Sequence, residues 1–288
     1  MSEGLRVACL VPSATDLAVR LGLNVVGVSH ECDHPAVRGL PVLTRSRVAA
    51  ARPDGPGAGE VDLAVRAAVA EGGPLYLVDR ARLAALAPDV VLSQALCDVC
   101  AARADSGDLP RGARLLELTA CTLAGLHRDV RAVAELCGVA ESGELCVAEV
   151  AAELSGLLLN DRSRRPRVVT LEWSDPPFLG GHWVPELVEI AGGEHLLSGT
   201  GERSRVTTWD EVIAADPEVV VFMPCGYSLD AAVAEANTLP GLPGALWATA
   251  AGRLFSRCTP DSVVAGARVL AAVLRGVEVE GLARRIRP

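Results

Sequence analysis

Lysine is missing from this 288-residue sequence, in which every basic side chain other than histidine is an arginine. The chain therefore cannot form a Schiff base on a lysine, and it lacks the lysine of a phosphate-binding P-loop. Aromatic side chains are also few, with four Trp, two Tyr and three Phe, which leaves little for stacking on nucleic-acid bases. The net charge of -9 repels phosphate backbones. We therefore expect no nucleic-acid partner.

Long apolar runs are absent too. No window approaches the ~20 apolar residues that a membrane-spanning helix needs. The start, MSEGLRVACLVPSATD, has Glu3 ahead of a short apolar run that Pro12 ends, which is not the pattern of a secretory signal. We therefore expect a cytoplasmic protein with no membrane span.

What the sequence has in quantity is apolar residues, which make up half of it. At roughly 150 residues per domain, the length indicates two domains. Short β-branched runs alternate with Ala/Leu/Arg-rich stretches of helical length, a pattern that predicts an α/β fold with parallel sheets. The strands are expected at Leu5–Val11, Val25–Val28, Asp89–Ser93, Leu115–Leu118, Arg167–Leu171, Glu218–Phe222 and Arg253–Phe255.

A long helical region separates the two series of strands. It starts at Thr122, and we expect Gly138 to end a first helix and Glu141–Asn160 to form a second. The predicted architecture is two α/β lobes joined by one long helix. Its parts are an N-terminal lobe (1–121), a linking helical region (122–165) and a C-terminal lobe (166–288). Capping boxes are expected at Ser13-x-x-Asp16 and at Thr208-x-x-Glu211.

Polar side chains and cysteines follow most of the predicted strands. In open α/β sheets, ligands lie outside the carboxyl ends of the strands, so these residues are the candidates for a site. Six of the nine cysteines occupy such positions, and the other three, Cys9, Cys137 and Cys146, are expected to fill the core. The six are Cys32, Cys97, Cys100, Cys121, Cys225 and Cys258. If the lobes face each other, these thiols converge on one cleft with Glu172, His182 and His30.

The pair Cys97-x-x-Cys100 allows three interpretations. It can be a redox dithiol, two inert buried thiols, or part of a metal or cluster site. The further strand-end thiols Cys32 and Cys225 favour metal ligation. An iron–sulfur cluster or zinc could be ligated by the thiols of Cys32, Cys97 and Cys225, with Cys100 or Cys121 as a fourth ligand.

Such a site with three protein ligands leaves one coordination position open for a substrate. Glu172 or His182 would then act as general acid or base. His182 follows two glycines that permit close backbone approach to a ligand. Trp173 and Trp183 either stack on a planar ligand or pack in the wall of the cleft.

Several of these motifs together resemble a known family. There are four such motifs: Pro12-Ser13-Ala14-Thr15-Asp16, His30-Glu31-Cys32-Asp33, Gln94-x-x-Cys97-Asp98-Val99-Cys100, and the segment from Leu171 to Glu186, LEWSDPPFLGGHWVPE. They are similar to the cobalamin-binding-protein-like branch of the helical-backbone (class III) periplasmic substrate-binding proteins, over about residues 5–275. The resemblance implies two Rossmann-like lobes with parallel sheets, joined by a long backbone helix. It also implies a ligand cleft between the lobes that holds cobalamin, haem or a ferric siderophore. Residues expected to line that pocket are Ser13, Thr15, Trp173, Trp183 and Tyr227.

Two hypotheses for function follow. In the first, the cleft binds a metal or iron–sulfur cluster through cysteine, and an open coordination site would make the protein a metalloenzyme. In the second, the protein binds a corrinoid, haem or siderophore, as proteins that serve ABC transporters do. In both, the partner is a small molecule or metal complex. The lack of a predicted export signal argues against an ABC importer as partner.

Overall fold

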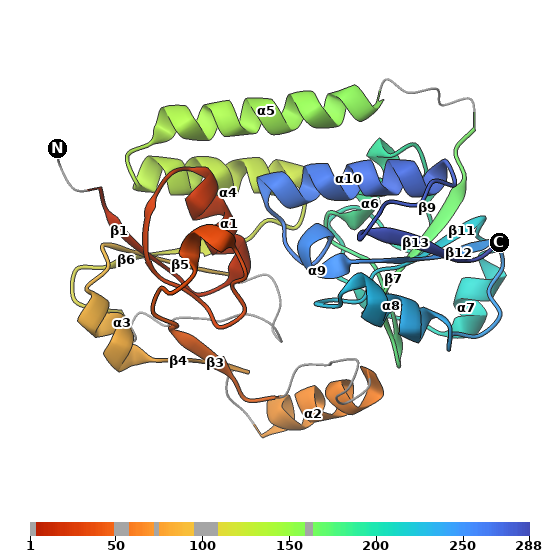
Figure 1. Cartoon of the computed structure of the whole chain (residues 1–288), viewed down its shortest axis with the longest axis horizontal. Helices are drawn as coiled ribbons and strands as arrows, with labels where there is room; N and C mark the ends of the chain where they lie inside the picture. Colours follow the sequence, from red (N-terminus) through yellow and green to blue (C-terminus); the bar gives the residue numbers. More distant parts are fainter. Residues whose placement is uncertain (1–3, 49–57, 72–74, 95–108, 159–163) are drawn as a thin grey trace. The chain divides into compact units, whose positions relative to one another are not determined.

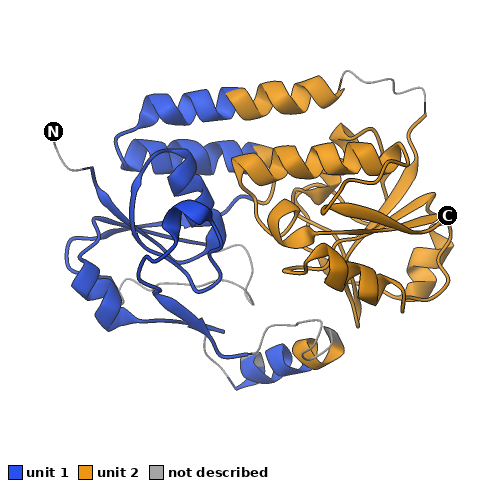
Figure 2. Cartoon of the chain, in the orientation of Figure 1, with its two compact units in different colours: residues 1–49, 63–120, 124–148 blue, residues 50–62, 121–123, 149–288 orange. Residues whose placement is uncertain are grey.

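The computed structural model describes residues 4–48, 58–71, 75–94, 109–158 and 164–288 (Figure 1). The chain forms two compact units. Unit 1 holds residues 1–49, 63–120 and 124–148, and unit 2 holds residues 50–62, 121–123 and 149–288 (Figure 2). Each unit contains a sheet with parallel strands and packed helices, so the predicted fold class is confirmed.

Unit 1 is built on a four-stranded parallel sheet in the order β2-β1-β5-β6. Residues Val7 and Leu92 on the inner strands are fully buried. Helix α1 packs on β1 and β2, and β3 and β4 form a separate antiparallel pair. The elements are β1 (Arg6–Cys9), α1 (Pro12–Arg20), β2 (Asn24–Gly27), a 3₁₀ turn η1 (Pro35–Val37), β3 (Thr44–Ser46), β4 (Tyr76–Val78), α3 (Arg80–Leu86), β5 (Val90–Gln94) and β6 (Arg114–Leu118).

Unit 2 has a larger, mixed sheet in the order β10-β8-β7-β11-β12-β13, with β9 also paired to β7. Strands β7, β11 and β12 are parallel, and their side chains form the hydrophobic core together with α8. The elements are β7 (Arg167–Ser174), β8 (Pro177–Leu179), α6 (Val184–Ile190), β9 (Glu194–His195), β10 (Arg205–Val206), α7 (Trp209–Ala214), β11 (Val219–Phe222), α8 (Leu229–Ala236), β12 (Ala245–Thr249), α9 (Ala251–Leu254), α10 (Pro260–Leu274) and β13 (Ala283–Arg287).

Three helices have residues in both units: α2 (Ala58–Ala70), α4 (Leu123–Leu136) and α5 (Ala140–Leu158). The two helices predicted in the linking region are therefore confirmed as α4 and α5. Gly138 lies between them with φ 73°, the left-handed conformation that ends a helix most easily at glycine. Within unit 1, α5 approaches α4 so closely that a Cβ on Gly143 would lie 2.5 Å from the Cβ of Ala134.

Six of the seven predicted strands are confirmed, and the seventh is wrong. Residues 253–255 were expected as a strand, but Ala251–Leu254 form the helical turn α9, and the strand is β12. The sequence of β12, ALWAT, begins with alanine and leucine, which favour helix in isolation. Between β11 and β13, its backbone completes two ladders, and this tertiary pairing outweighs the local preference.

The predicted capping boxes also differ in outcome. The Thr208 side chain accepts a hydrogen bond from the Glu211 amide and caps α7, which is one half of the predicted box, while the Glu211 carboxylate binds Arg205 and Thr207. The prediction for Ser13 is wrong, because α1 begins at Pro12 after Val11, which provides no side-chain cap. Proline suits the first helical position since its φ is already helical and its missing N–H is not needed there. Ser13 is thereby placed inside the helix.

Candidate functional site

In unit 1, the polar groups gather where β1 and β5 end. The chain leaves β1 on one side to form β2 and returns on the other side to form β5, so the strand order reverses between β1 and β5. Ligands of open α/β sheets bind at such a reversal. There the Ser13 hydroxyl, just after β1, donates a 3.2 Å hydrogen bond to the Gln94 amide oxygen at the end of β5.

Thr15 and Cys32 lie close together near the same edge. The Thr15 hydroxyl is 3.0 Å from Cys32 Sγ, and Thr15 is fully buried. Cys32 itself is half-buried. Cys9, at the end of β1, is buried as predicted, and burial raises the pKa of its thiol far above the ordinary range.

In unit 2, the strand order reverses between β7 and β11, and Glu172 and Cys225 mark that point. The Cys225 amide donates to the Glu172 carbonyl at 3.3 Å, which ties the two strand ends together. One carboxylate oxygen of Glu172 accepts a 2.7 Å hydrogen bond from the Ser204 hydroxyl. Cys225 itself is exposed.

An aromatic pair flanks these strand ends. The rings of Trp173, on β7, and Tyr227, after β11, meet edge to face with centroids 5.8 Å apart. The Tyr227 hydroxyl is hydrogen-bonded to Glu235 on α8, and burial together with this carboxylate raises the pKa of the phenol. Ser174 donates to the same carboxylate. The Trp173 indole N–H is buried and has no hydrogen-bond partner among the described residues.

His182 has an unusual backbone conformation. Its φ is 55°, its N–H donates to the Glu202 carbonyl at 2.6 Å, and its carbonyl accepts from the Gly201 amide at 2.8 Å. A Cβ on the preceding Gly181 would lie 2.5 Å from the Ser204 nitrogen, so only glycine allows this loop to approach.

The His182 ring stacks on the ring of Trp183 at 5.9 Å. Burial, and after it the charge of Arg203, lower the pKa of His182, so the ring is neutral at pH 7. Trp183 is only 4% exposed. Its indole ring therefore packs inside the protein beside the imidazole and does not offer an open face on which a planar ligand could stack. The indole of Trp183 and Nδ1 of His182 have no hydrogen-bond partners within the described part of the chain.

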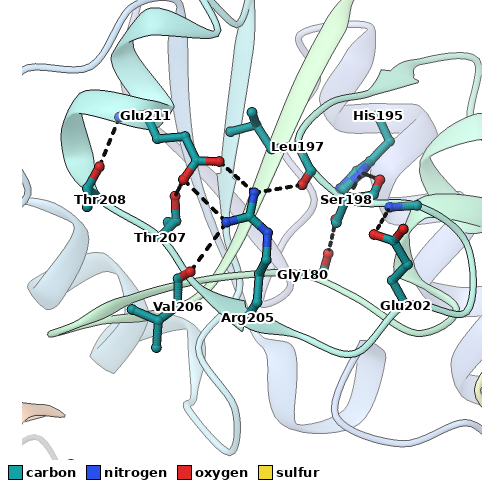
Figure 3. A network of polar contacts seen from close by, with 11 residues as sticks. Gly180, His195, Leu197, Ser198, Glu202, Arg205, Val206, Thr207, Thr208 and Glu211 are labelled. Atoms are coloured by element: carbon teal, nitrogen blue, oxygen red, sulfur yellow. Dashed lines mark hydrogen bonds and ion pairs between the residues drawn. The ribbon is translucent and has the colours of Figure 1, made fainter.

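A polar network supports the loops beside this site (Figure 3). The Ser198 hydroxyl donates to the Gly180 carbonyl at 2.5 Å, and the Gly199 amide donates to Glu202 at 2.8 Å. Farther along, Glu211 binds the Arg205 guanidinium at 2.5 Å and the Thr207 hydroxyl at 2.7 Å. These contacts hold the segments on both sides of His182 in place.

The predicted metal site is not assembled within the described ranges, where no group of three or more His, Cys, Asp or Glu side chains is placed to hold a metal ion. Cys97 and Cys100 lie outside those ranges. Cys32 belongs to unit 1, whereas half-buried Cys121 and exposed Cys225 belong to unit 2. Ligation of an iron–sulfur cluster or zinc therefore stays a prediction, as do acid–base roles for Glu172 and His182. Cys258, expected after a strand, instead follows α9 and is buried.

Sequence reasoning missed several residues that contact the candidate residues within each unit. Gln94, Ser204 and Glu235 contact residues that lie 81, 32 and 61 positions away in the chain. Gln94 alone had a usable signal, because it directly follows a predicted strand. The other two carry no local pattern and are brought to their partners by tertiary folding.

Across the described ranges, no helix is both long enough and apolar enough to span a membrane.

Comparison with known proteins finds similarity in structure only. No protein-family model matches the chain, and no curated protein sequence matches it either. A possible iron-binding periplasmic protein of Staphylococcus epidermidis superposes with a TM-score of 0.68 at 15% identity, covering 95% of this chain and 99% of that one.

Two proteins of Vibrio cholerae are also similar. Its periplasmic vitamin B12 binding protein has a TM-score of 0.63 at 17% identity, covering 95% and 97% of the two chains. Its periplasmic heme binding protein has a TM-score of 0.68 at 14% identity, covering 94% and 98%. At these identities, the likeness shows a shared fold.

Proposed function

We propose that this chain, which has the fold of the helical-backbone periplasmic substrate-binding proteins, binds a metal-containing macrocycle, a corrinoid or a haem. Solved proteins of this fold include ones described as binding vitamin B12 and heme. The protein would act by holding its ligand, with no chemical step of its own. This is the second of the two hypotheses that the sequence left open.

The observation that carries the proposal is the aromatic pair Trp173–Tyr227 at the strand-order reversal of unit 2. Small-molecule sites combine apolar and aromatic surface with a few placed polar groups. Here the two rings supply the apolar surface, while the exposed Cys225 and the Glu172–Ser204 pair supply polar atoms beside them. Such a surface suits a large planar ring with polar substituents.

The test is a titration of the purified protein with ferric haemin and, separately, with aquocobalamin, followed by visible absorption and gel filtration. We expect at least one of them to bind and to comigrate with the protein. In the variant Trp173→Leu, the affinity should fall by roughly 30-fold, because an aromatic side chain central to an interface contributes about 2 kcal/mol or more.

The matched control is Trp209→Leu, because Trp209 on α7 packs against the hydrophobic core. It should retain the wild-type affinity, and circular dichroism should confirm that both variants fold. A protein that retains neither macrocycle, and that holds iron with acid-labile sulfide after purification without oxygen, would contradict the proposal.

A further inference from the structure

Glu235 is a half-buried residue of unit 2 to which the proposed function gives no role. It lies near the C-terminal end of α8. Its carboxylate accepts hydrogen bonds from two hydroxyls, that of Ser174 at the end of β7 and that of Tyr227 after β11. The strand order of the sheet reverses between these two strands. One carboxylate therefore joins α8 to both strand ends at the reversal.

The backbone of Glu235 is held in place from two sides. Its carbonyl accepts hydrogen bonds from the Thr238 amide at 2.9 Å and from the Thr238 hydroxyl at 2.8 Å. Ala232 and Ala236, on the same helix, are fully buried in the hydrophobic core of unit 2. Because protein cores are close-packed, a helix packed in this way has little freedom to shift. The Glu235 carboxylate therefore extends from a fixed backbone position.

The hydrogen bond to Glu235 holds the far end of the Tyr227 side chain. A carboxylate has only acceptor oxygens, so the phenol donates. Burial, and after it this hydrogen bond, raise the pKa of Tyr227, so the hydroxyl keeps its proton at neutral pH. The Tyr227 ring also packs against the core of unit 2. Hydrogen bonds to an ionised group are stronger than those between neutral groups, so the ring is held at both ends.

The Trp173 ring has no comparable polar contact. Its indole N–H is buried and has no hydrogen-bond partner among the residues that the structure describes. The ring meets Tyr227 edge to face, with centroids 5.8 Å apart and an angle of 76° between the ring planes. Such contacts are directional, so the orientation of one ring constrains that of the other. The orientation of Trp173 thus depends on Tyr227, and that of Tyr227 depends on Glu235.

We propose that Glu235 is a positioning residue for the ligand: by holding the Tyr227 hydroxyl, it keeps the Trp173–Tyr227 pair in the orientation that receives a planar ring. This inference rests on the proposed function and adds how the aromatic surface is ordered before the ligand arrives. Glu235 needs no contact with the ligand. Side chains that are already ordered lose less conformational entropy on binding, so the affinity is higher.

The experiment compares the affinities of wild-type protein, Glu235→Ala, Glu235→Gln and Tyr227→Phe for ferric haemin and for aquocobalamin. We expect Glu235→Ala to bind roughly 10-fold more weakly, because two side chains must then be ordered on binding. Glu235→Gln, whose amide oxygen still accepts from Tyr227, should keep most of the wild-type affinity. Tyr227→Phe keeps the ring but loses the hydroxyl, so it should bind as weakly as Glu235→Ala.

The double variant Glu235→Ala/Tyr227→Phe separates positioning from a general structural role. If Glu235 acts through the Tyr227 hydroxyl, the double variant should bind no more weakly than either single variant. If Glu235 only stabilises the fold, the two losses should multiply, which would contradict the inference. The matched control is Asp230→Ala, which removes an exposed carboxylate from the same helix and should leave the affinity unchanged.

Circular dichroism of the free protein gives a readout that needs no ligand. We expect the near-ultraviolet signal of the aromatic rings to weaken in Glu235→Ala and to be retained in Glu235→Gln, with equal far-ultraviolet spectra. If wild type binds a macrocycle and Glu235→Ala keeps both its affinity and its near-ultraviolet signal, this inference fails while the proposed function stands. If wild type binds neither macrocycle, the proposed function fails, and the inference fails with it. Should Glu235→Ala not fold, Tyr227→Phe with unchanged affinity would overturn the inference.

Discussion

Single side chains hold the loops of unit 2, and Glu211 is one of them. It receives hydrogen bonds from Arg205 and Thr207, and its own amide is capped by Thr208 (Figure 3). These contacts, with Arg205 first, lower the pKa of Glu211 to about 2. The pair is partly exposed, so salt screens it.

The depressed pKa predicts how stability changes with pH. Because the folded protein binds this proton less readily than the unfolded chain, Glu211 contributes stability above about pH 4.5, and the contribution is lost as pH falls toward 2. Urea midpoints measured between pH 2 and 6 should therefore fall less steeply with acid for Glu211→Gln than for wild type. Glu117→Gln, which changes an exposed carboxylate on β6, is the control. Equal slopes for Glu211→Gln and wild type would contradict the prediction.

At the residue scale, the sequence predicted which candidate residues lie near strand ends better than it predicted which side chains contact one another. It placed Glu172, Trp173, Cys225 and Tyr227 after strands. The structure has Cys225 and Tyr227 just past β11, whereas Glu172 and Trp173 lie within the last three residues of β7, which runs on to Ser174. It could not reveal that Thr44 would meet His30, because β3 and the end of β2 approach only in the folded chain. Hydrogen-bond partners distant in sequence leave no local pattern.

At the scale of elements, helix α5 contains two glycines with different roles. A Cβ on Gly143 would meet Ala134 of α4 at 2.5 Å, whereas a Cβ on Gly156 would meet nothing within 4 Å. Gly143 is thus required for helix packing, and Gly156 is a weak point of an exposed helix surface.

The same substitution at these two glycines should therefore have opposite effects. Gly156→Ala should stabilise the protein by about 0.5–1 kcal/mol, because alanine favours helix over glycine. Gly143→Ala should destabilise it by roughly 1–3 kcal/mol, the usual cost of forcing a methyl group into a packed contact. Chemical denaturation of the two variants beside wild type measures both. Stabilisation by Gly143→Ala would show that α4 and α5 pack less closely than described.

At the scale of elements, patterning predicted those that carry their own signal. The β-branched strands β1, β2, β5, β7 and β11 and the helices α4 and α5 were found from sequence. Strands of two or three residues, such as β9 and β10, are too short to show a period. Strand β12 was missed because ladders to both neighbours outweigh its helical preference.

At the scale of the whole molecule, unit 2 has a hydrophobic core of its own. The residues of that core, which include Val169, Phe222 and Leu246, all lie between positions 169 and 248 of the chain. The edge strand β13 is anchored as well, because Arg287 donates to the Pro240, Ala236 and Leu239 carbonyls.

A fragment of residues 164–288 should therefore fold alone. We expect one cooperative urea transition by circular dichroism, with a slope of about 1–3 kcal/mol per molar, as for other small domains. The full chain measured alongside serves as the reference. A gradual loss of ellipticity without a transition would mean that the core of unit 2 depends on the rest of the chain.

The sequence by itself determined the α/β class, the two series of parallel strands, the helical region between them and the strand-end positions of the candidate residues. These follow from hydrophobic period, glycine and proline placement and the rule that ligands lie at the carboxyl ends of strands, all of which act over a few residues. Only the tertiary structure decided the contact of His30 with Thr44, the Trp173–Tyr227 pair, the Ser204 contact of Glu172 and the strand identity of β12. Each of these depends on groups far apart in the chain, and their contact energies exist only once the sheets have formed.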